Sequence, residues 1–466
     1  MKFDFDILCI GLGPAGMAVT IMASEMGLKV CAIEKNKIGG ECMNVGCIPS
    51  KGLLAIAKAR TIVDKFPLME LSAQKQPEVK NPFKRIQKDI AFINEKKTVK
   101  MFDKVKLILN QGHAEFINKN TVKVGTQIIS AKRIFIATGT EPMVPPIPGL
   151  KDVPFLTNNT IFSLEKIPES MVILGGGAIG CEMAQAFSKL GCKCSIVQMG
   201  EHLLPLGDKE AGDTLEQTFT SQGITVLNNK KIIKIEKTDT QIIVSTEDGI
   251  QIKAEKLLAA TGRKIDLSSL KLENAGIKFS QKGIQVNNFL QTSSKNIFAV
   301  GDCNGHHLFS HAAMHQGMLA LMNALMPLKQ NFKKYIVPWT VFTEPQISYA
   351  GKNEAELIRR KIKYETIKVK YEDYGAAIAE SVETGFLKAF ISPTGKIYGI
   401  SIAGEGSGEM INEWALAIQN KINIVKIMML QHSFPTMGFL SKRVAETWMM
   451  KKMQLSWVKK ICKLFA

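Results

Sequence analysis

The chain contains two cysteines, Cys42 and Cys47, in one short polar stretch, and their thiols are well suited to carry out a reaction. A helix beginning here would put the two sulfur atoms about one turn apart, within reach of a disulfide. A position near a helix N-terminus would also lower a thiol pKa. A metal half-site and two buried thiols are the alternatives, but no second cysteine pair offers the matching spacing of a four-ligand site. The sequence therefore favours a redox-active pair and predicts no metal site.

A glycine-rich turn near the N-terminus connects a predicted strand to a predicted helix. The expected strand, helix and strand cover residues 3–10, 14–27 and 29–33. The turn carries Gly11, Gly13 and Gly16. Glycines at this spacing permit a tight turn, close approach to a pyrophosphate and close helix–strand packing. The helix N-terminus attracts phosphates, and Glu34 at the end of the second strand is placed to accept hydrogen bonds from a ribose.

The same pattern recurs later in the chain. The strand, helix and strand are expected at residues 170–174, 181–190 and 194–198. Their turn carries Gly175, Gly177 and Gly180. Two such units predict two bound dinucleotides. A stiff, proline-rich crossing at residues 141–149 separates them and is a good domain junction.

Taken together, these motifs resemble the pyridine nucleotide–disulfide oxidoreductases, the flavoprotein family of dihydrolipoamide dehydrogenase, glutathione reductase and mercuric reductase. The resemblance runs from about residue 4 to about residue 440, and the motifs are most similar to those of dihydrolipoamide dehydrogenase. Supporting stretches are residues 137–139, 260–263, 297–302 and 342–345. The resemblance implies an α/β fold with two doubly wound dinucleotide-binding domains, one split around the other, and a C-terminal α+β dimerisation domain.

The resemblance also implies a division of the chain and an assembly. The expected parts are an FAD-binding domain (1–150 and 268–330), an NAD(P)-binding domain (151–267), a dimerisation domain (335–440) and a basic amphipathic C-terminal helix (441–466). A homodimer with FAD and NAD(P)H as cofactors is expected. Electrons would pass between nicotinamide, flavin and the Cys42–Cys47 disulfide, and from there to a small-molecule or small disulfide acceptor.

Roles at matching positions follow from the same resemblance. Cys47 would be the thiolate nearer the flavin, Cys42 the thiol that meets the substrate, and Lys51 and Glu182 an ion pair beside the flavin N5. Asp302 would hold the ribityl or pyrophosphate part of FAD. Further residues expected at the cofactors are Lys51, Thr138, Gly139, Gln198, Gly262, Arg263 and Gly301.

The sequence departs from the family at its acid–base pair. Members that handle thiols end with a His-Pro-Thr motif and a Glu five residues after that His, but here Phe434 and Phe439 stand at the two positions. A positioned acid–base typically contributes about 10²–10⁴-fold to a rate. His432, two residues upstream, is a substitute if it swings in, and otherwise an ordinary loop histidine. The alternative function is therefore a mercuric-reductase-like enzyme, or a quinone or metal-ion reductase, that needs no acid–base histidine. Mercuric reductase delivers its ion through a C-terminal cysteine pair, whereas only Cys462 occurs near this end of the chain.

The coenzyme position is also unusual. Gln198 stands where an NAD enzyme of this family would have a Glu that binds the ribose. An NADP enzyme would show an Arg nearby, and its absence favours NADH.

Two histidines four residues apart, His311 and His315, lie on the helix expected from about residue 311. Such a pair on one helix face suits a metal, but no third ligand is evident. Packing, or a contact near the flavin pyrimidine, is favoured.

The composition excludes several classes of protein. The 466 residues are 45% hydrophobic and 22% charged, which predicts two to four globular domains and excludes a disordered or disulfide-stapled chain. No apolar run reaches the roughly 18 residues of a membrane span. No signal peptide is evident, and nine cysteines are too few for a disulfide framework, so a cytoplasmic location is expected. The net charge is +18, but the sequence has no basic stripe interleaved with aromatic residues, which is typical of a nucleic-acid interface. No nucleic-acid partner is therefore predicted.

The C-terminal segment 441–466 carries much of this charge. Its seven basic residues against one acidic residue, Glu446, give +6. The basic residues are Lys442, Arg443, Lys451, Lys452, Lys459, Lys460 and Lys463. One helical stripe holds Met450, Met453, Trp457, Ile461 and Leu464. This pattern suits either peripheral contact with an anionic membrane at its inner face or a helix docked on the dimer.

Overall fold

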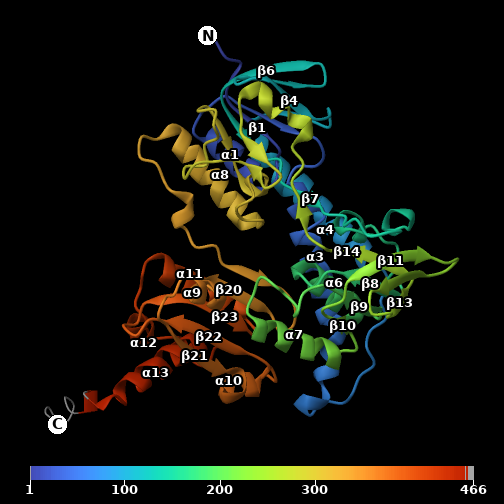
Figure 1. Ribbon diagram of the computed structural model, residues 1–466, viewed down its shortest axis with the longest axis vertical. Coiled ribbons are helices and arrows are strands. Elements are labelled where there is room, and N and C mark those ends of the chain that lie inside the picture. The colour runs from blue at the N-terminus through green and yellow to red at the C-terminus, as the bar shows by residue number, and fades with distance from the viewer. Residues whose placement is uncertain (1, 457, 460–466) are drawn as a thin grey trace.

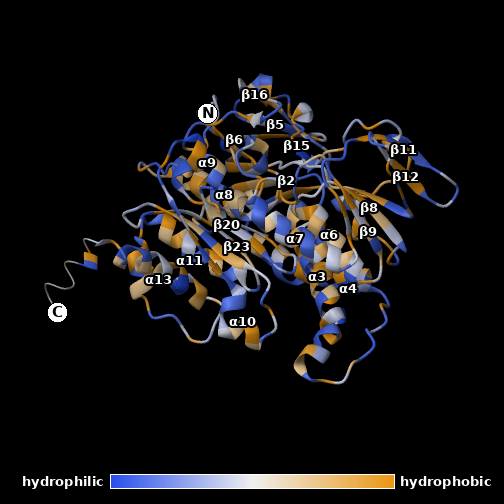
Figure 2. Ribbon diagram, turned by 60° about the horizontal axis from the view of Figure 1, so that its bottom comes forward, coloured by the Kyte–Doolittle hydropathy of each residue, from blue (hydrophilic) through white to orange (hydrophobic). Residues whose placement is uncertain are grey.

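The computed structural model describes residues 2–456, 458 and 459 of the chain, and its elements gather around three main sheets (Figure 1). The first sheet combines N-terminal strands, drawn in blue and cyan, with a later yellow segment. The second sheet is green and the third is orange to red. Hydrophobic residues concentrate in the strands and on helix faces, whereas the outer loops are mostly hydrophilic (Figure 2).

The first sheet has the order β3-β2-β1-β6-β5-β4, and β18 also pairs with β6, on the edge opposite β1. Its strands are β1 (Phe5–Ile10), β2 (Val30–Glu34), β3 (Lys106–Leu109), β4 (Ala114–Asn118), β5 (Thr121–Val124), β6 (Gln127–Ile136) and β18 (Ile297–Ala299). Strands β3, β2, β1, β6 and β18 run parallel, whereas β5 is antiparallel to β6 and β4 is antiparallel to β5. The chain therefore returns to this sheet after completing the second one, which confirms the predicted split of one nucleotide fold around the other.

Helices of the first unit position the reactive stretch. They are α1 (Pro14–Glu25), α2 (Gly40–Asn44), α3 (Cys47–Thr61), α4 (Pro82–Phe92) and α8 (Ser310–Leu325). Helices α1 and α8 pack so closely that a Cβ added at Gly317 would lie 2.4 Å from the carbonyl oxygen of Ala15. This contact holds the middle of α8 against the start of α1, which follows the glycine turn of the first unit.

The second sheet is parallel, with the order β10-β9-β8-β14. Its strands are β8 (Ser170–Leu174), β9 (Lys193–Val197), β10 (Thr225–Leu227) and β14 (Lys256–Ala259). It is joined by helices α5 (Asn158–Ile161), α6 (Ala178–Lys189) and α7 (Lys209–Ser221) and by an antiparallel sheet of β11 (Ile232–Lys237), β12 (Ile242–Thr246) and β13 (Gln251–Ala254). The outgoing and returning crossings, β7 (Glu141–Pro142) and β15 (Arg263–Lys264), pair with each other. A short hairpin, β16 (Phe279–Ser280) and β17 (Gly283–Ile284), precedes the return to β18.

The third sheet is antiparallel, with the order β19-β20-β23-β22-β21. Its strands are β19 (Trp339–Val341), β20 (Ile347–Gly351), β21 (Glu365–Lys370), β22 (Phe386–Ile391) and β23 (Ile397–Ala403). Its helices are α9 (Glu354–Arg359), α10 (Gly375–Ala379), α11 (Ser407–Gln419), α12 (Ile424–Met429) and α13 (Phe439–Met453). Trp414 of α11 is fully buried and donates to the Ser441 hydroxyl of α13 at 3.0 Å, so α13 belongs to this core.

The basic C-terminal segment begins as part of this packed domain. Val444, Ala445 and Trp448 of α13 are buried, whereas Met450 and Met453 of the predicted apolar stripe are exposed. The remaining members of that stripe, Trp457, Ile461 and Leu464, lie outside the described residues. The first half of the segment therefore docks on the domain through a face other than the predicted stripe.

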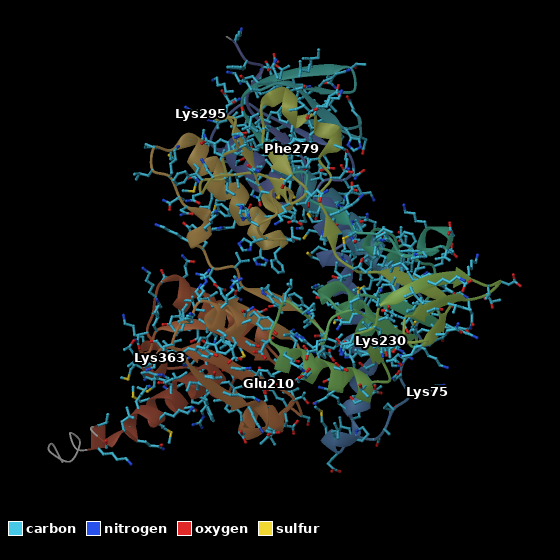
Figure 3. All side chains as sticks on the ribbon, viewed as in Figure 1. Lys75, Glu210, Lys230, Phe279, Lys295 and Lys363 are labelled. Atoms are coloured by element: carbon cyan, nitrogen blue, oxygen red, sulfur yellow. The ribbon has the colours of Figure 1, made fainter. Side chains whose placement is uncertain are left out.

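Positive charge is spread widely over the rest of the surface. The labelled lysines Lys75, Lys230, Lys295 and Lys363 lie on different sides of the molecule (Figure 3). In the part of the chain that the structure describes, no helix is long and apolar enough to cross a membrane.

Candidate active site

The two glycine turns have the same geometry. In the first, Gly11 has a φ of +97°, and an added Cβ would lie 2.4 Å from the carbonyl oxygen of Ala137. A Cβ at Gly16 would lie 1.9 Å from the carbonyl oxygen of Gly11, whereas one at Gly13 would meet nothing within 4 Å. The turn is thus closed toward the protein and open where a pyrophosphate would approach. Gly175, Gly180 and Gly177 repeat these three conditions in the second unit.

Polar groups around the first turn fit a bound dinucleotide. The buried Glu34 accepts hydrogen bonds from the backbone N–H groups of Leu12 at 2.7 Å and Asn36 at 2.8 Å, so its carboxylate is fixed at the turn. Among the described residues, the buried hydroxyl of Thr138 has no hydrogen-bond partner. A buried hydroxyl without a partner is costly, and a cofactor in the adjoining cradle would satisfy it.

Asp302, Arg263 and Thr140 form a polar network beside this cradle. The Arg263 guanidinium donates to the Thr140 hydroxyl at 2.5 Å and lies 4.0 Å from the Asp302 carboxylate, and Thr140 donates to Asp302 at 3.0 Å. Burial raises the pKa of Asp302. Arg263 also pairs with Glu41, the residue directly before Cys42. Arg263 therefore links the segment that carries Cys42 to the polar network at the expected flavin site. Glu41 and Thr140 were not predicted as residues of this site.

Gly139, Gly262 and Gly301 lie on the loops that follow strand ends near this network. All three have positive φ values, between 69° and 131°. Gly301 is held by its backbone N–H, which donates to Gln316 of α8 at 2.9 Å.

Cys42 and Cys47 lie on two helices rather than on one. Cys42 belongs to α2, which ends at Asn44, and Cys47 is the first residue of α3. The predicted single helix is therefore wrong, because the chain breaks at Val45 and Gly46. Gly46 is tightly packed: a Cβ there would lie 2.9 Å from the carbonyl oxygen of Glu41. The break nevertheless leaves both thiols partly accessible and places Cys47 at a helix N-terminus.

The two thiols have opposite proton affinities. A hydrogen bond from Cys42, together with the Ser310 hydroxyl and the charge of Lys51, lowers the pKa of Cys47 to about 6. The Cys47 sulfur lies 3.3 Å from the Ser310 hydroxyl at the start of α8. The hydrogen bond to Cys47, with burial, raises the pKa of Cys42. In the reduced pair, Cys47 is thus the thiolate at neutral pH and Cys42 is the protonated thiol.

Lys51 and Glu182 join the two nucleotide units at this site. The Lys51 ammonium donates to both Glu182 oxygens, at 2.8 and 3.0 Å. Glu182 is buried on α6 and also accepts the backbone N–H of Phe342 at 3.0 Å. The Phe342 ring lies beneath the ammonium, 4.3 Å from its centroid, and fixes its position through a cation–π contact.

Comparison with known proteins gives this geometry a family. Residues 5–317 match the family described as pyridine nucleotide-disulphide oxidoreductase, and residues 337–442 match the dimerisation domain of that family. The chain belongs to the pyridine nucleotide-disulphide oxidoreductases. It is an enzyme of the flavoprotein disulfide oxidoreductase class, and the family uses FAD and NAD(P)H.

Relatives in this family differ in their named substrates. The chain is 31% identical to a mercuric reductase of Staphylococcus aureus, over 90% of this chain and 78% of the relative. It is also 31% identical to a dihydrolipoyl dehydrogenase of Chlamydia pneumoniae, over 94% of this chain and 95% of the relative. The Cu(II) complex of the HOCl-induced flavoprotein disulfide reductase RclA from Escherichia coli is 26% identical, with a TM-score of 0.85 over 97% of this chain and 100% of that chain.

Gln198, at the position where the family binds the coenzyme ribose, is fixed by hydrogen bonds. Gln198 follows β9 directly and is buried, and its amide nitrogen donates to Asn228 at 2.6 Å. Its carbonyl oxygen faces the second glycine turn, since a Cβ at Gly176 would lie 2.3 Å from it. Asn228 donates in turn to Glu216 at 2.6 Å. Gln198 thus presents an acceptor, and no positive charge, to the turn.

At the family's acid–base position the structure shows aromatic rings. Phe434 is 72% exposed, and its ring meets Phe439 edge to face with centroids 5.3 Å apart. His432 does not take their place: its side chain is only 8% exposed and its Nε2 lies 2.9 Å from the Glu413 carboxylate. This pairing agrees with the loop-histidine alternative.

The two histidines of α8 are engaged in packing. His311 Nε2 lies 2.7 Å from the Pro338 carbonyl oxygen, and the His315 ring meets Tyr335 edge to face at 4.6 Å. Within the described ranges, no three His, Cys, Asp or Glu side chains gather in a way that could hold a metal ion.

Proposed function

We propose that this enzyme passes electrons from NADH, through its Cys42/Cys47 pair, to a thiol-binding metal ion, with Cu(II) as the first candidate. The observation that carries the proposal is the pair of phenyl rings, Phe434 and Phe439, where family members that exchange thiols have an acid–base pair. A metal-ion acceptor takes electrons without a proton delivered to it. A disulfide acceptor needs that proton for its leaving thiolate.

The dithiol itself suits such an acceptor. Thiolate sulfur is a soft ligand that prefers Cu(I), so it favours reduction of Cu(II), and Cys47 is a thiolate above a pH of about 6. Two Cu(II) ions each take one electron and become Cu(I). The Cys42 thiol and the Cys47 thiolate lose those two electrons as the S–S bond forms, and the Cys42 proton is released to solvent. Two relatives support this choice, since one is named a mercuric reductase and another was solved as a Cu(II) complex.

The chain's own residues prepare the return of electrons to the pair. Bound FAD would supply the hydride-accepting ring between NADH and the disulfide. The glycine turn at Gly11–Gly16, with Glu34, Thr138 and Asp302, would hold it. Lys51, fixed by Glu182 and Phe342, places a positive charge near Cys47 and stabilises its thiolate.

NADH is the proposed coenzyme. The carbonyl oxygen of Gln198 can accept a hydrogen bond from a ribose 2′-hydroxyl. The 2′-phosphate of NADPH would instead lie against that carbonyl oxygen and near the Glu216 carboxylate, which accepts a hydrogen bond from Asn228. No Arg directly follows β9 to bind the phosphate.

The wider organisation is proposed on the same grounds. The matched dimerisation domain supports a homodimer. The division at residues 1–150 and 268–330, 151–267, 335–440 and 441–466, and the membrane contact of the last segment, remain predictions to be tested.

An anaerobic turnover assay tests the proposed acceptor. The FAD-loaded enzyme is given NADH and either Cu(II) or lipoamide, and both NADH loss and Cu(I) formation are followed with a Cu(I)-specific chelator. We expect Cu(II) turnover at least about 10²-fold faster than lipoamide turnover, because the acid–base contribution is missing. The Cys42→Ser variant is the control for direct reaction of copper with NADH, because it lacks the dithiol but is assayed under the same conditions. Lipoamide turnover matching that of Cu(II), or full Cu(II) turnover by Cys42→Ser, would overturn the proposal.

A further inference from the structure

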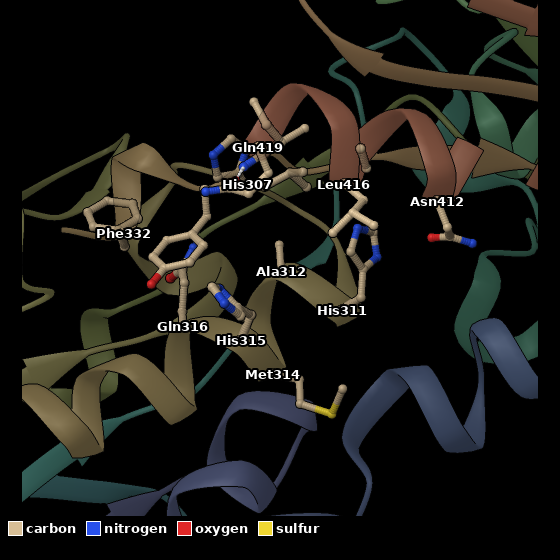
Figure 4. A pocket seen from close by; sticks show the side chains of 14 residues that line it. His307, His311, Ala312, Met314, His315, Gln316, Phe332, Asn412, Leu416 and Gln419 are labelled. Carbon is tan, nitrogen blue, oxygen red and sulfur yellow. Dashed lines mark hydrogen bonds between the residues drawn. The ribbon is translucent and has the colours of Figure 1, made fainter. Parts of the chain in front are cut away.

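A cavity of about 470 Å³ lies between α8 and α11, where the first sheet's domain meets the third (Figure 4). The rings of His311 and His315 project from α8 toward α11, which presents Leu416 and Gln419 from the other side. Its volume falls within the range of sites that hold small organic molecules. The glycine turns and the Cys42/Cys47 pair do not line it.

The lining restricts the charge of a ligand. Among the described residues, the side chains around the cavity include no Asp, Glu, Lys or Arg. Phe332, Tyr335 and Leu416 supply aromatic and aliphatic surface. An ionic ligand would lose its hydration here without gaining a counter-ion, which is costly. The cavity therefore suits an uncharged molecule with flat apolar faces.

His307 and His315 are lining side chains that can bind a ligand through their ring nitrogens. His311 is occupied by the Pro338 carbonyl, and Gln419 accepts the backbone N–H of Ile336 at 2.7 Å. Burial, together with the neighbouring His311, lowers the pKa of His307, and burial lowers the pKa of His315. Both rings are therefore neutral at pH 7, and each offers one N–H donor and one acceptor nitrogen.

We propose that this cavity binds an uncharged, planar aromatic molecule that carries carbonyl oxygens, which is the chemistry of a quinone. The flat faces would pack against Phe332, Tyr335 and Leu416, and the carbonyl oxygens would accept hydrogen bonds from His307 and His315. This proposal does not depend on the metal-ion acceptor proposed above, because it concerns binding of the molecule in the cavity and not its reduction.

The test uses 2,3-dimethyl-1,4-naphthoquinone as the probe, because both of its reactive ring positions are blocked against thiol addition. Binding to the oxidised, FAD-loaded full-length enzyme is measured by equilibrium dialysis without NADH, so that no reduction occurs. We expect saturable binding by the wild type. His315→Phe keeps the edge-to-face contact with Tyr335 but removes the N–H, and about tenfold weaker binding is expected. His113→Phe, at an exposed position before β4, is the matched control and should bind as the wild type does.

Two further variants block the cavity without touching the redox pair. Ala415→Trp fills it from α11, and Leu416→Glu, at a 62% exposed position, adds a charge at its edge. Both should abolish probe binding while FAD content stays unchanged. The proposal fails if the wild type does not bind the probe or if these variants bind it equally well. It also fails if either variant splits the dimer in sedimentation velocity, because the cavity would then be covered by a second copy of the chain.

Discussion

The Cys47 sulfur lies 3.3 Å from the Ser310 hydroxyl, although 263 residues separate them in the chain. Each is the first residue of a helix, α3 for Cys47 and α8 for Ser310. The positive ends of two helix dipoles therefore meet at one sulfur atom, and both favour its thiolate form. This convergence depends on the close packing of α8 on α1, which holds the N-terminus of α8 in place.

Removing the hydroxyl tests the contribution of Ser310. Ser310→Ala takes away a hydrogen bond that favours the Cys47 thiolate, so the pKa of Cys47 should rise from about 6 by about one unit. The measurement is the rate of iodoacetamide alkylation of the reduced enzyme as a function of pH. The thiolate, and hence the rate, is present above the pKa and is lost as the pH falls through it. Ser433→Ala, at an exposed loop position, is the control, and an unchanged profile in Ser310→Ala would contradict the assignment.

The Lys51–Glu182 pair predicts two shifts of opposite sign. The charge of Lys51 lowers the pKa of Cys47 and that of Glu182 raises it. Lys51→Met should therefore move the alkylation profile to higher pH, whereas Glu182→Gln should move it to lower pH. Gln keeps an oxygen for the Phe342 N–H, so the second variant changes charge more than structure. Shifts in the same direction would mean that both variants merely disturb packing.

The coenzyme proposal predicts a change in selectivity at Gln198. Gln198→Arg places a positive charge where a 2′-phosphate would lie, so the ratio of kcat/KM for NADPH to that for NADH should rise at least about tenfold. The assay is NADH or NADPH oxidation with a fixed acceptor. Gln241→Arg, an exposed position between β11 and β12, adds the same charge elsewhere and should leave the ratio unchanged. A wild type that already prefers NADPH would refute the interpretation of Gln198.

Restoring the family's acid–base pair tests whether its loss determines the acceptor. Phe434→His combined with Phe439→Glu should raise lipoamide turnover by about 10²-fold or more, the usual contribution of a positioned acid–base. Phe434 is exposed, so the histidine is accommodated without refilling a core. Phe434→His alone is the matched control and should gain less, because nothing orients its ring. If the folded, FAD-loaded double variant gains nothing, another feature excludes lipoamide.

The sequence predicted local features of the site more fully than contacts between distant segments. The glycine turns and the strand ends near Glu34 and Gln198 depend on neighbouring residues, and each lies where its pattern indicated. Ser310 and Glu41 were missed, because their contacts with Cys47 and Arg263 span 263 and 222 residues and leave no local pattern. The break between α2 and α3 was missed because a single Gly46 is an ambiguous helix signal.

The C-terminal segment gives the last prediction. Because Val444 and Trp448 of α13 are buried in the third domain, truncation at residue 441 would damage the fold, and the informative cut lies after Met453. This cut removes Lys459, Lys460 and Lys463 but keeps the docked part of α13. If the segment binds anionic membranes, the full chain should co-sediment with phosphatidylglycerol-containing vesicles more than the truncated chain does. Salt should weaken this binding, because each lysine contributes about 1 kcal/mol through a screened interaction. Vesicles of phosphatidylcholine alone are the control, and equal sedimentation of both chains with anionic vesicles would exclude this contact.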